Sequence, residues 1–212
     1  MTEKKFLVSV FFMSYCVASG DLIVASTQSE VVGVNKKVDI SWIKKLFDNF
    51  HSVQSGVIYR CSQLSHQRLK RYVHRIGIKT IINLRGENQS MQWWQEERDL
   101  AQECSLHFYN IPMCARTLPS KENLLKLLSI YETAPRPILL HCYSGADRTG
   151  EAAALWVIEQ QKQSKEIALK HLSFRYGHIK SRRPAKHFFI NLWQDKEWLM
   201  QRYNPKDYPQ FC

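Results

Sequence analysis

The sequence predicts an α/β fold in which helices flank a central, mostly parallel (mixed) sheet of four to five strands. Short runs of apolar and β-branched residues alternate with longer segments whose apolar residues recur at a helical period. The chain has 212 residues, which suits one domain with a sizeable core. No internal repeat or low-complexity tract interrupts the alternation.

The predicted strands are short and are bounded by turn residues. Residues 50–53 and 57–60 are expected to pair through Ser55 and Gly56. The other predicted strands cover residues 80–84, 106–111 and 138–140. Helical periods are predicted over residues 65–76, 91–103, 120–131, 149–161, 165–176 and 184–203, the first of them closed by Gly77.

The first nineteen residues have the features of a secretory signal peptide. Lys4 and Lys5 precede an apolar stretch, and small residues follow it just before Gly20. An uncleaved membrane anchor is the alternative, and only then is membrane contact expected. We therefore expect a signal peptide at 1–19, a leader segment at 20–38, one folded domain at 39–212, and a secreted or periplasmic location.

The charge balance favours an anionic partner. The chain carries 30 Lys and Arg against 19 Asp and Glu, a formal net charge of +11, and about +10 remains after removal of residues 1–19. The basic residues are scattered, so no nucleic-acid-binding tail is predicted. There is no Cys-x-x-Cys pair, and the eight histidines have no ligand spacing with the cysteines. We expect no metal and no cofactor; the sequence does not predict the oligomeric state.

The chemistry is concentrated after the apolar run 138–140, where Cys142 is followed six residues later by Arg148. A cysteine attacks as its thiolate, which the N–H groups at a helix start favour. The same N–H groups can hold phosphate oxygens, and an arginine can donate to two of them. Thr149 is expected to stabilise the departing thiolate. The predicted phosphate-binding residues are Tyr143, Ser144, Gly145, Ala146, Asp147 and Arg148.

Residues 141–150, His-Cys-Tyr-Ser-Gly-Ala-Asp-Arg-Thr-Gly, resemble the signature of the cysteine-dependent protein tyrosine phosphatase superfamily. The wider chain, from residue 49 to about residue 189, is similar to its small atypical dual-specificity branch of bacterial type. The resemblance implies a phosphatase-like fold, a phosphatase domain at 39–212, a phosphocysteine formed on Cys142, phosphate bound by Arg148, and no metal. It also implies a phosphorylated protein or another anionic phosphoester as substrate.

One part of the family pattern is missing, because many members carry an aspartic acid on the loop before the third helix. Residues 110–119 of this chain contain no carboxylate. Asp147, inside the signature, is therefore the candidate general acid, and Glu122 is a weaker one. Three alternative functions remain open: an inositol phosphate or phosphoinositide phosphatase, a sulfurtransferase, and a phosphate-binding module without catalysis.

Several residues around the motif have less specific expectations. Arg60 and Arg85 each end a predicted strand, and we expect ordinary ion pairs for them rather than places at the rim of the site. His141 is expected to orient the loop. Trp93, Trp94 and Trp193 are expected to be packing residues.

Overall fold

A computed structural model describes residues 48–211. The predicted signal peptide at 1–19 and the leader segment at 20–38 lie outside the described residues, as does the start of the domain, and these assignments stay predictions. Within residues 48–211, no helix is both long enough and apolar enough to span a bilayer.

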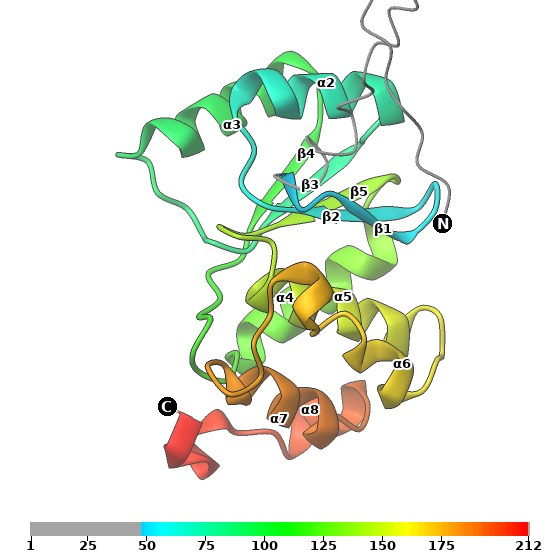
Figure 1. Ribbon diagram of the computed structural model, residues 1–212, viewed down its shortest axis with the longest axis vertical. Coiled ribbons are helices and arrows are strands. Elements are labelled where there is room, and N and C mark those ends of the chain that lie inside the picture. The colour runs from blue at the N-terminus through cyan, green and yellow to red at the C-terminus, as the bar shows by residue number, and fades with distance from the viewer. Residues whose placement is uncertain (1–47, 212) are drawn as a thin grey trace, which may run out of the picture. The chain divides into compact units, whose positions relative to one another are not determined.

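The centre of the fold is a five-stranded sheet in the order β1-β2-β5-β3-β4 (Figure 1). Its strands are β1 (His51–Gln54), β2 (Ile58–Cys61), β3 (Thr80–Asn83), β4 (His107–Asn110) and β5 (Ile138–His141). β1 runs antiparallel to β2, and every other pair is parallel. The predicted mixed, mostly parallel sheet is confirmed.

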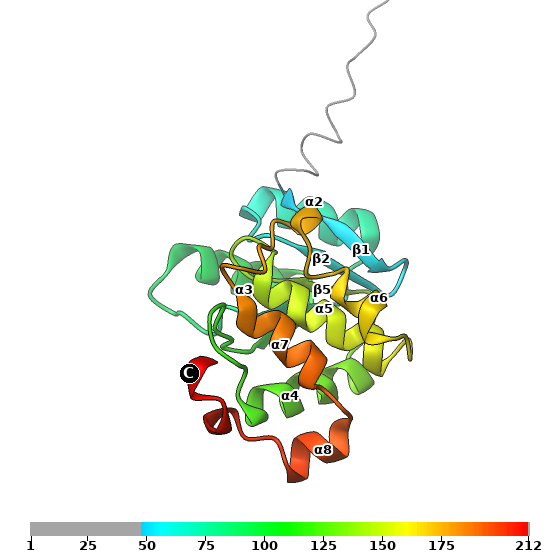
Figure 2. The same cartoon turned by 60° about the horizontal axis from the view of Figure 1, so that its bottom comes forward.

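Helices cover both faces of this sheet. One face carries α2 (His66–Ile76) and α3 (Gln92–Glu103), and the other carries α4 (Lys121–Thr133) and α5 (Asp147–Glu159) (Figure 1). The remaining helices are α6 (Lys165–Leu169), η1 (Phe174–Tyr176), α7 (Pro184–Leu192), α8 (Lys196–Gln201), η2 (Pro205–Asp207) and η3 (Pro209–Phe211). α6 and α7 both pack against α5 (Figure 2).

The central strands are apolar on both sides because both sides are buried. Ile81 and Leu139 pack in the cluster formed with α2 and α3. Their neighbours Ile82 and Leu140 belong to the larger cluster formed with α4, α5, α7 and α8. β5 is the middle strand of the sheet and leads directly to Cys142.

Two predicted helices are wrong in extent. The helix expected at 165–176 ends at Leu169, and only the single turn η1 follows. The reason is tertiary: the carbonyl of His171 accepts a hydrogen bond from Arg60 at 2.9 Å. The backbone there also packs so closely on α5 that a Cβ at Gly150 would lie 2.8 Å from His171 O.

The helix expected at 184–203 is two helices, α7 and α8. The Asp195 side chain accepts from Trp198 N at 2.6 Å and so starts α8 afresh. Just before it, Trp193 is fully buried and donates through Nε1 to Glu159 at 2.7 Å. The break allows this indole to enter the core.

Candidate active site

The segment of residues 142–148, here called the phosphate loop, runs from the end of β5 into the first turn of α5. α5 begins at Asp147, two residues earlier than the sequence predicts. Ala146 occupies the N-cap position of α5 and has no side-chain acceptor for the first N–H groups of the helix. A helix start of this kind is suited to bind an anion.

Three predicted catalytic residues lie together at this loop. Cys142 is 1% exposed at the end of β5, and Thr149 is fully buried in the first turn of α5. Within residues 48–211, Thr149 Oγ1 and Arg148 Nε have no hydrogen-bond partner. Among the described residues, the contacts of Arg148 Nη1 are long, to Leu84 O at 3.4 Å and Met113 O at 3.5 Å. Donors left unpaired in this way are available to phosphate oxygens.

Gly145 is required at its position by backbone geometry. Its φ is +73°, and an added Cβ would lie 2.6 Å from the carbonyl oxygen of Cys61 on the neighbouring strand. Any side chain would therefore push the phosphate loop away from β2. Burial raises the pKa of the Cys61 thiol well above its ordinary value, so this neighbouring cysteine stays protonated.

Arg60 holds the phosphate loop by donating hydrogen bonds to its backbone carbonyls. The ion pair expected for Arg60 from the sequence is therefore wrong. The side chain is completely buried and donates to Gly145 O at 2.7 Å and Ala146 O at 3.4 Å, as well as to His171 O. Its guanidinium also lies over the ring of Tyr176, 4.0 Å from the centroid. No carboxylate within residues 48–211 forms an ion pair with Arg60.

Asp147, the candidate acid, is held by two basic side chains. Its Oδ1 lies 2.7 Å from His178 Nδ1, and its Oδ2 lies 3.5 Å from Arg183 Nε. The carboxylate is partly exposed, with 17% of its side-chain surface accessible. The other candidate, Glu122, is exposed in the first turn of α4, where a carboxylate also stabilises the helix start.

The remaining predicted phosphate-binding residues differ in exposure. Tyr143 is 69% exposed, Ser144 is also exposed, and Ala146 is buried. Asn49 Nδ2 donates to Ser144 O at 2.9 Å and to Tyr176 O at the same distance. Sequence analysis missed both Asn49 and Tyr176, because neither is close to the motif along the chain.

Arg85 lies at the rim of the phosphate loop, so its predicted ion pair is also wrong. It donates to Gln63 Oε1 at 2.9 Å, and its guanidinium lies 3.4 Å from the centre of the Trp93 ring and 5.4 Å from that of Tyr143. Burial, and then the nearby positive charge of Arg148, lower the pKa of Arg85. The two guanidinium groups give this rim a positive charge.

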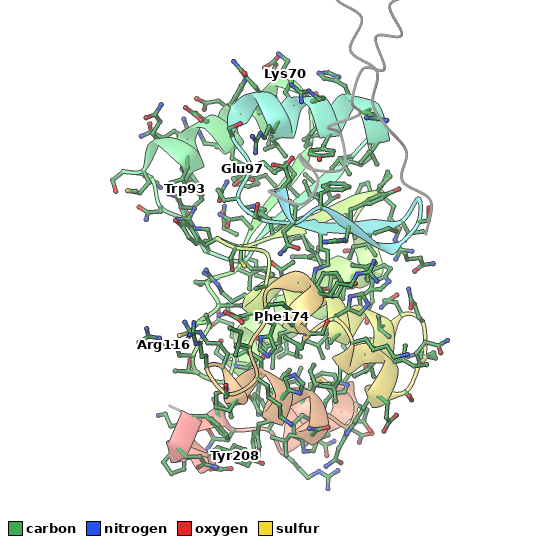
Figure 3. The ribbon with its side chains drawn as sticks, viewed as in Figure 1. Lys70, Trp93, Glu97, Arg116, Phe174 and Tyr208 are labelled. Atoms are coloured by element: carbon green, nitrogen blue, oxygen red, sulfur yellow. The ribbon has the colours of Figure 1, made fainter. Side chains whose placement is uncertain are left out.

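Buried polar pairs anchor the strand that precedes the phosphate loop and the helix that follows it. His141 Nε2 lies 2.9 Å from Glu97 Oε1, and Figure 3 shows Glu97 on α3. On the other face, the fully buried Lys186 lies 2.9 Å from Glu151 and donates to Thr117 O at 2.8 Å. His141 thus contacts α3, and its orienting role stays a prediction.

The packing role expected of the tryptophans differs among them. Trp94 and Trp193 are buried, whereas Trp93 is partly exposed beside Arg85. Cys61, Cys104, Cys114 and Cys142 are all free thiols. Within residues 48–211, no group of three or more His, Cys, Asp or Glu side chains is placed to hold a metal ion.

The family model described as "DSP-PTPase phosphatase fused to NAD+ Kinase" matches residues 38–187. The chain belongs to this family, and it is a cysteine-dependent phosphatase of the protein tyrosine phosphatase superfamily with an atypical dual-specificity-like fold. No curated protein matches the chain significantly.

Solved structures show the same fold. TpbA from P. aeruginosa, crystallised with phosphotyrosine, is 20% identical, with 72% of this chain and 88% of that chain covered and a TM-score of 0.55. The catalytic domain of the PP-IP phosphatase Siw14 from S. cerevisiae is 26% identical, with 70% and 87% covered and a TM-score of 0.58. A phosphatase-like protein from Shewanella putrefaciens is 14% identical, with 79% and 98% covered and a TM-score of 0.57.

Replacing Arg60 with methionine is expected to lower both stability and turnover. Gly145 O and His171 O lose a buried donor, which costs about 1–3 kcal/mol for each group left unpaired. Urea denaturation and hydrolysis of p-nitrophenyl phosphate measure the two effects. Arg60→Lys, which keeps the charge, is expected to retain more of the activity. A methionine variant as stable and active as the wild type would contradict the supporting role of Arg60.

Stability is expected to fall as the pH falls from about 6.5 to about 4. Burial, and then Arg60, lower the pKa of His171 from 6.5 to about 4. In that window the unfolded chain binds a proton that the folded chain does not. Urea midpoints at about pH 7.5 and about pH 5 test this. The fall should be smaller in His171→Gln and unchanged in the control His74→Gln, which alters an exposed histidine; equal falls in all three proteins would refute it.

Proposed function

We propose that this phosphatase hydrolyses phosphomonoesters of proteins, with Cys142 as nucleophile and Arg148 as the principal phosphate ligand. The observation that carries the proposal is the set of unpaired donors, Arg148 Nε, Thr149 Oγ1 and the uncapped start of α5, gathered around a buried cysteine. Protein tyrosine phosphate is the favoured substrate within this class. The TpbA structure, which has the same fold, contains phosphotyrosine.

In the first step the Cys142 thiolate attacks phosphorus, and a P–S bond forms as the bond from phosphorus to the leaving oxygen breaks. The N–H groups of residues 143–148 and the Arg148 guanidinium stabilise the charge on the phosphoryl oxygens. The Thr149 hydroxyl, which has no hydrogen-bond partner within residues 48–211, is our proposed donor to the departing sulfur. In the second step water attacks phosphorus and gives a proton to the carboxylate that protonated the leaving oxygen, the P–S bond breaks, and inorganic phosphate leaves with the thiolate restored.

Asp147 is our proposed donor of the proton that the leaving oxygen needs. It is the carboxylate within the phosphate loop, and part of its side chain reaches solvent. Its contacts with His178 and Arg183 also fix its position. A residue that only holds these two basic side chains would affect every substrate equally, so the two roles can be separated by experiment.

An inositol phosphate or inositol pyrophosphate is the second candidate substrate. It is favoured by the similarity to Siw14, a PP-IP phosphatase, and by the basic rim formed by Arg85 and Arg148. The family match favours a phosphatase over a sulfurtransferase. A phosphate-binding module without catalysis would show no turnover in the wild type.

Cys142→Ser is expected to reduce hydrolysis of p-nitrophenyl phosphate by about a thousandfold or more, because a serine hydroxyl is not ionised at neutral pH. Cys104→Ser is the matched control, since Cys104 is a free and only partly buried thiol at the end of α3. Initial rates of the wild type and both variants make the test. Full turnover by Cys142→Ser would rule out the phosphocysteine mechanism.

Asp147→Asn is expected to lose most rate on aryl phosphates with poor leaving groups, because those phenoxides need a proton as they depart. The measurement is kcat/KM across a series of aryl phosphates of rising leaving-group pKa, for the wild type and the variant. An equal loss across the series would mean that Asp147 positions His178 and Arg183 and is not the acid.

A further inference from the structure

A cavity of about 660 Å³ adjoins the phosphate loop on the side of η1. Three of its lining residues, Tyr143, Ser144 and Ala146, belong to the loop itself. The others come from the start of β1 and the residues just before it, from the segment after β2, and from η1 with its flanking glycine. They are Asn49, His51, Ser62, Gln63, Phe174, Arg175, Tyr176 and Gly177. Because the cavity shares three residues with the phosphate loop, it is a candidate place for the part of a substrate that lies beyond its phosphate.

The wall formed by η1 is rigidly attached to the phosphate loop. The Tyr176 ring packs on Arg60 and makes an edge contact with His51, with ring centres 4.8 Å apart. The Asn49 side-chain amide donates hydrogen bonds to the backbone carbonyls of both Tyr176 and Ser144. Because one amide holds both segments, the distance between the wall and the phosphate loop is set by the fold.

Two exposed aromatic rings belong to this cavity. Phe174 is 83% exposed on η1, and Tyr143 is 69% exposed on the phosphate loop. Figure 3 shows Phe174 on η1. Large apolar side chains left in water next to a catalytic loop are typical of a surface that is covered when a substrate binds. An aromatic or peptide group is the chemistry that such rings contact best.

The cavity also carries a single strong cation. Arg175 is exposed, and none of the residues that line the cavity is acidic. Burial, followed by Arg60 and Arg175, lowers the pKa of His51 and so favours its neutral form. An inositol polyphosphate would need several cations around its ring, whereas one acidic side chain of a peptide needs a single cation. The cavity therefore suits the peptide better.

We propose that Phe174 and Arg175 form a recognition site for the peptide beside a phosphotyrosine, with Phe174 contacting the peptide and Arg175 binding an acidic side chain. This inference rests on the proposed function, and it adds the residues that select the substrate. The phosphate loop hydrolyses the phosphate ester. Phe174 and Arg175 on η1 select which peptide carries it.

The test compares kcat/KM on p-nitrophenyl phosphate, on a phosphotyrosine peptide with glutamate next to the phosphotyrosine, and on the same peptide with alanine there. Phe174→Ala is expected to lower the ratio of peptide to p-nitrophenyl phosphate about three- to tenfold for both peptides. Arg175→Gln is expected to lower it about two- to fivefold for the glutamate peptide alone.

Matched controls are Met200→Ala, an exposed apolar residue on α8, and Arg71→Gln, an exposed arginine on α2. Neither should change the ratio. Unchanged ratios in both Phe174→Ala and Arg175→Gln would overturn the recognition site while leaving the phosphatase intact. A panel in which these variants slow only inositol polyphosphates would overturn the peptide assignment. A wild type that hydrolyses none of the substrates would instead refute the proposed function.

Discussion

The structure around the active site depends on one buried arginine. The phosphate loop turns two of its carbonyls toward Arg60, and donation from the guanidinium to Gly145 O and Ala146 O holds them there. Burial lowers the pKa of Arg60 to about 10, so the side chain remains charged at neutral pH. It therefore places a permanent positive charge under a loop whose ligand and nucleophile are both anionic. A lysine has no planar fork with which to hold two carbonyls.

The same side chain links the chemistry to the proposed recognition surface. Arg60 donates to His171 O and lies over Tyr176, so the short turn η1 is built on the residue that supports the phosphate loop. Asn49 makes a second link between the two segments. A change in η1 can therefore alter both substrate selection and loop geometry, whereas exposed positions such as Phe174 can vary without disturbing the loop.

The loop at residues 110–119 is anchored rather than free. Lys186 donates to Thr117 O, and Tyr203 donates to Pro119 O at 2.7 Å. Leu118 N donates to Phe211 O at 3.1 Å, which adds the C-terminal segment to the anchors. A loop held at several points is poorly suited to carry a moving acid. This agrees with the proposal that proton donation comes from within the phosphate loop.

The local sequence pattern by itself determined the strands of the sheet and the position of the phosphate loop. The alternation of apolar runs and helical periods predicted the five strands, and the signal is strongest in β3 and β5, which are buried on both faces of the sheet. The signature from His141 to Gly150 predicted the phosphate loop, because its residue types are required by its own backbone and chemistry. Gly145 shows this directly through its positive φ and its contact with Cys61.

Only the tertiary structure decided what surrounds that loop. Arg60 is 85 residues from Gly145, and Asn49 is 127 residues from Tyr176, so no periodicity connects them. The breaks after Leu169 and Leu192 have the same origin, since backbone groups there bond to distant partners or a side chain enters the core. Spacing along the chain records local bonding and burial. It does not record which distant carbonyl a buried guanidinium will bind.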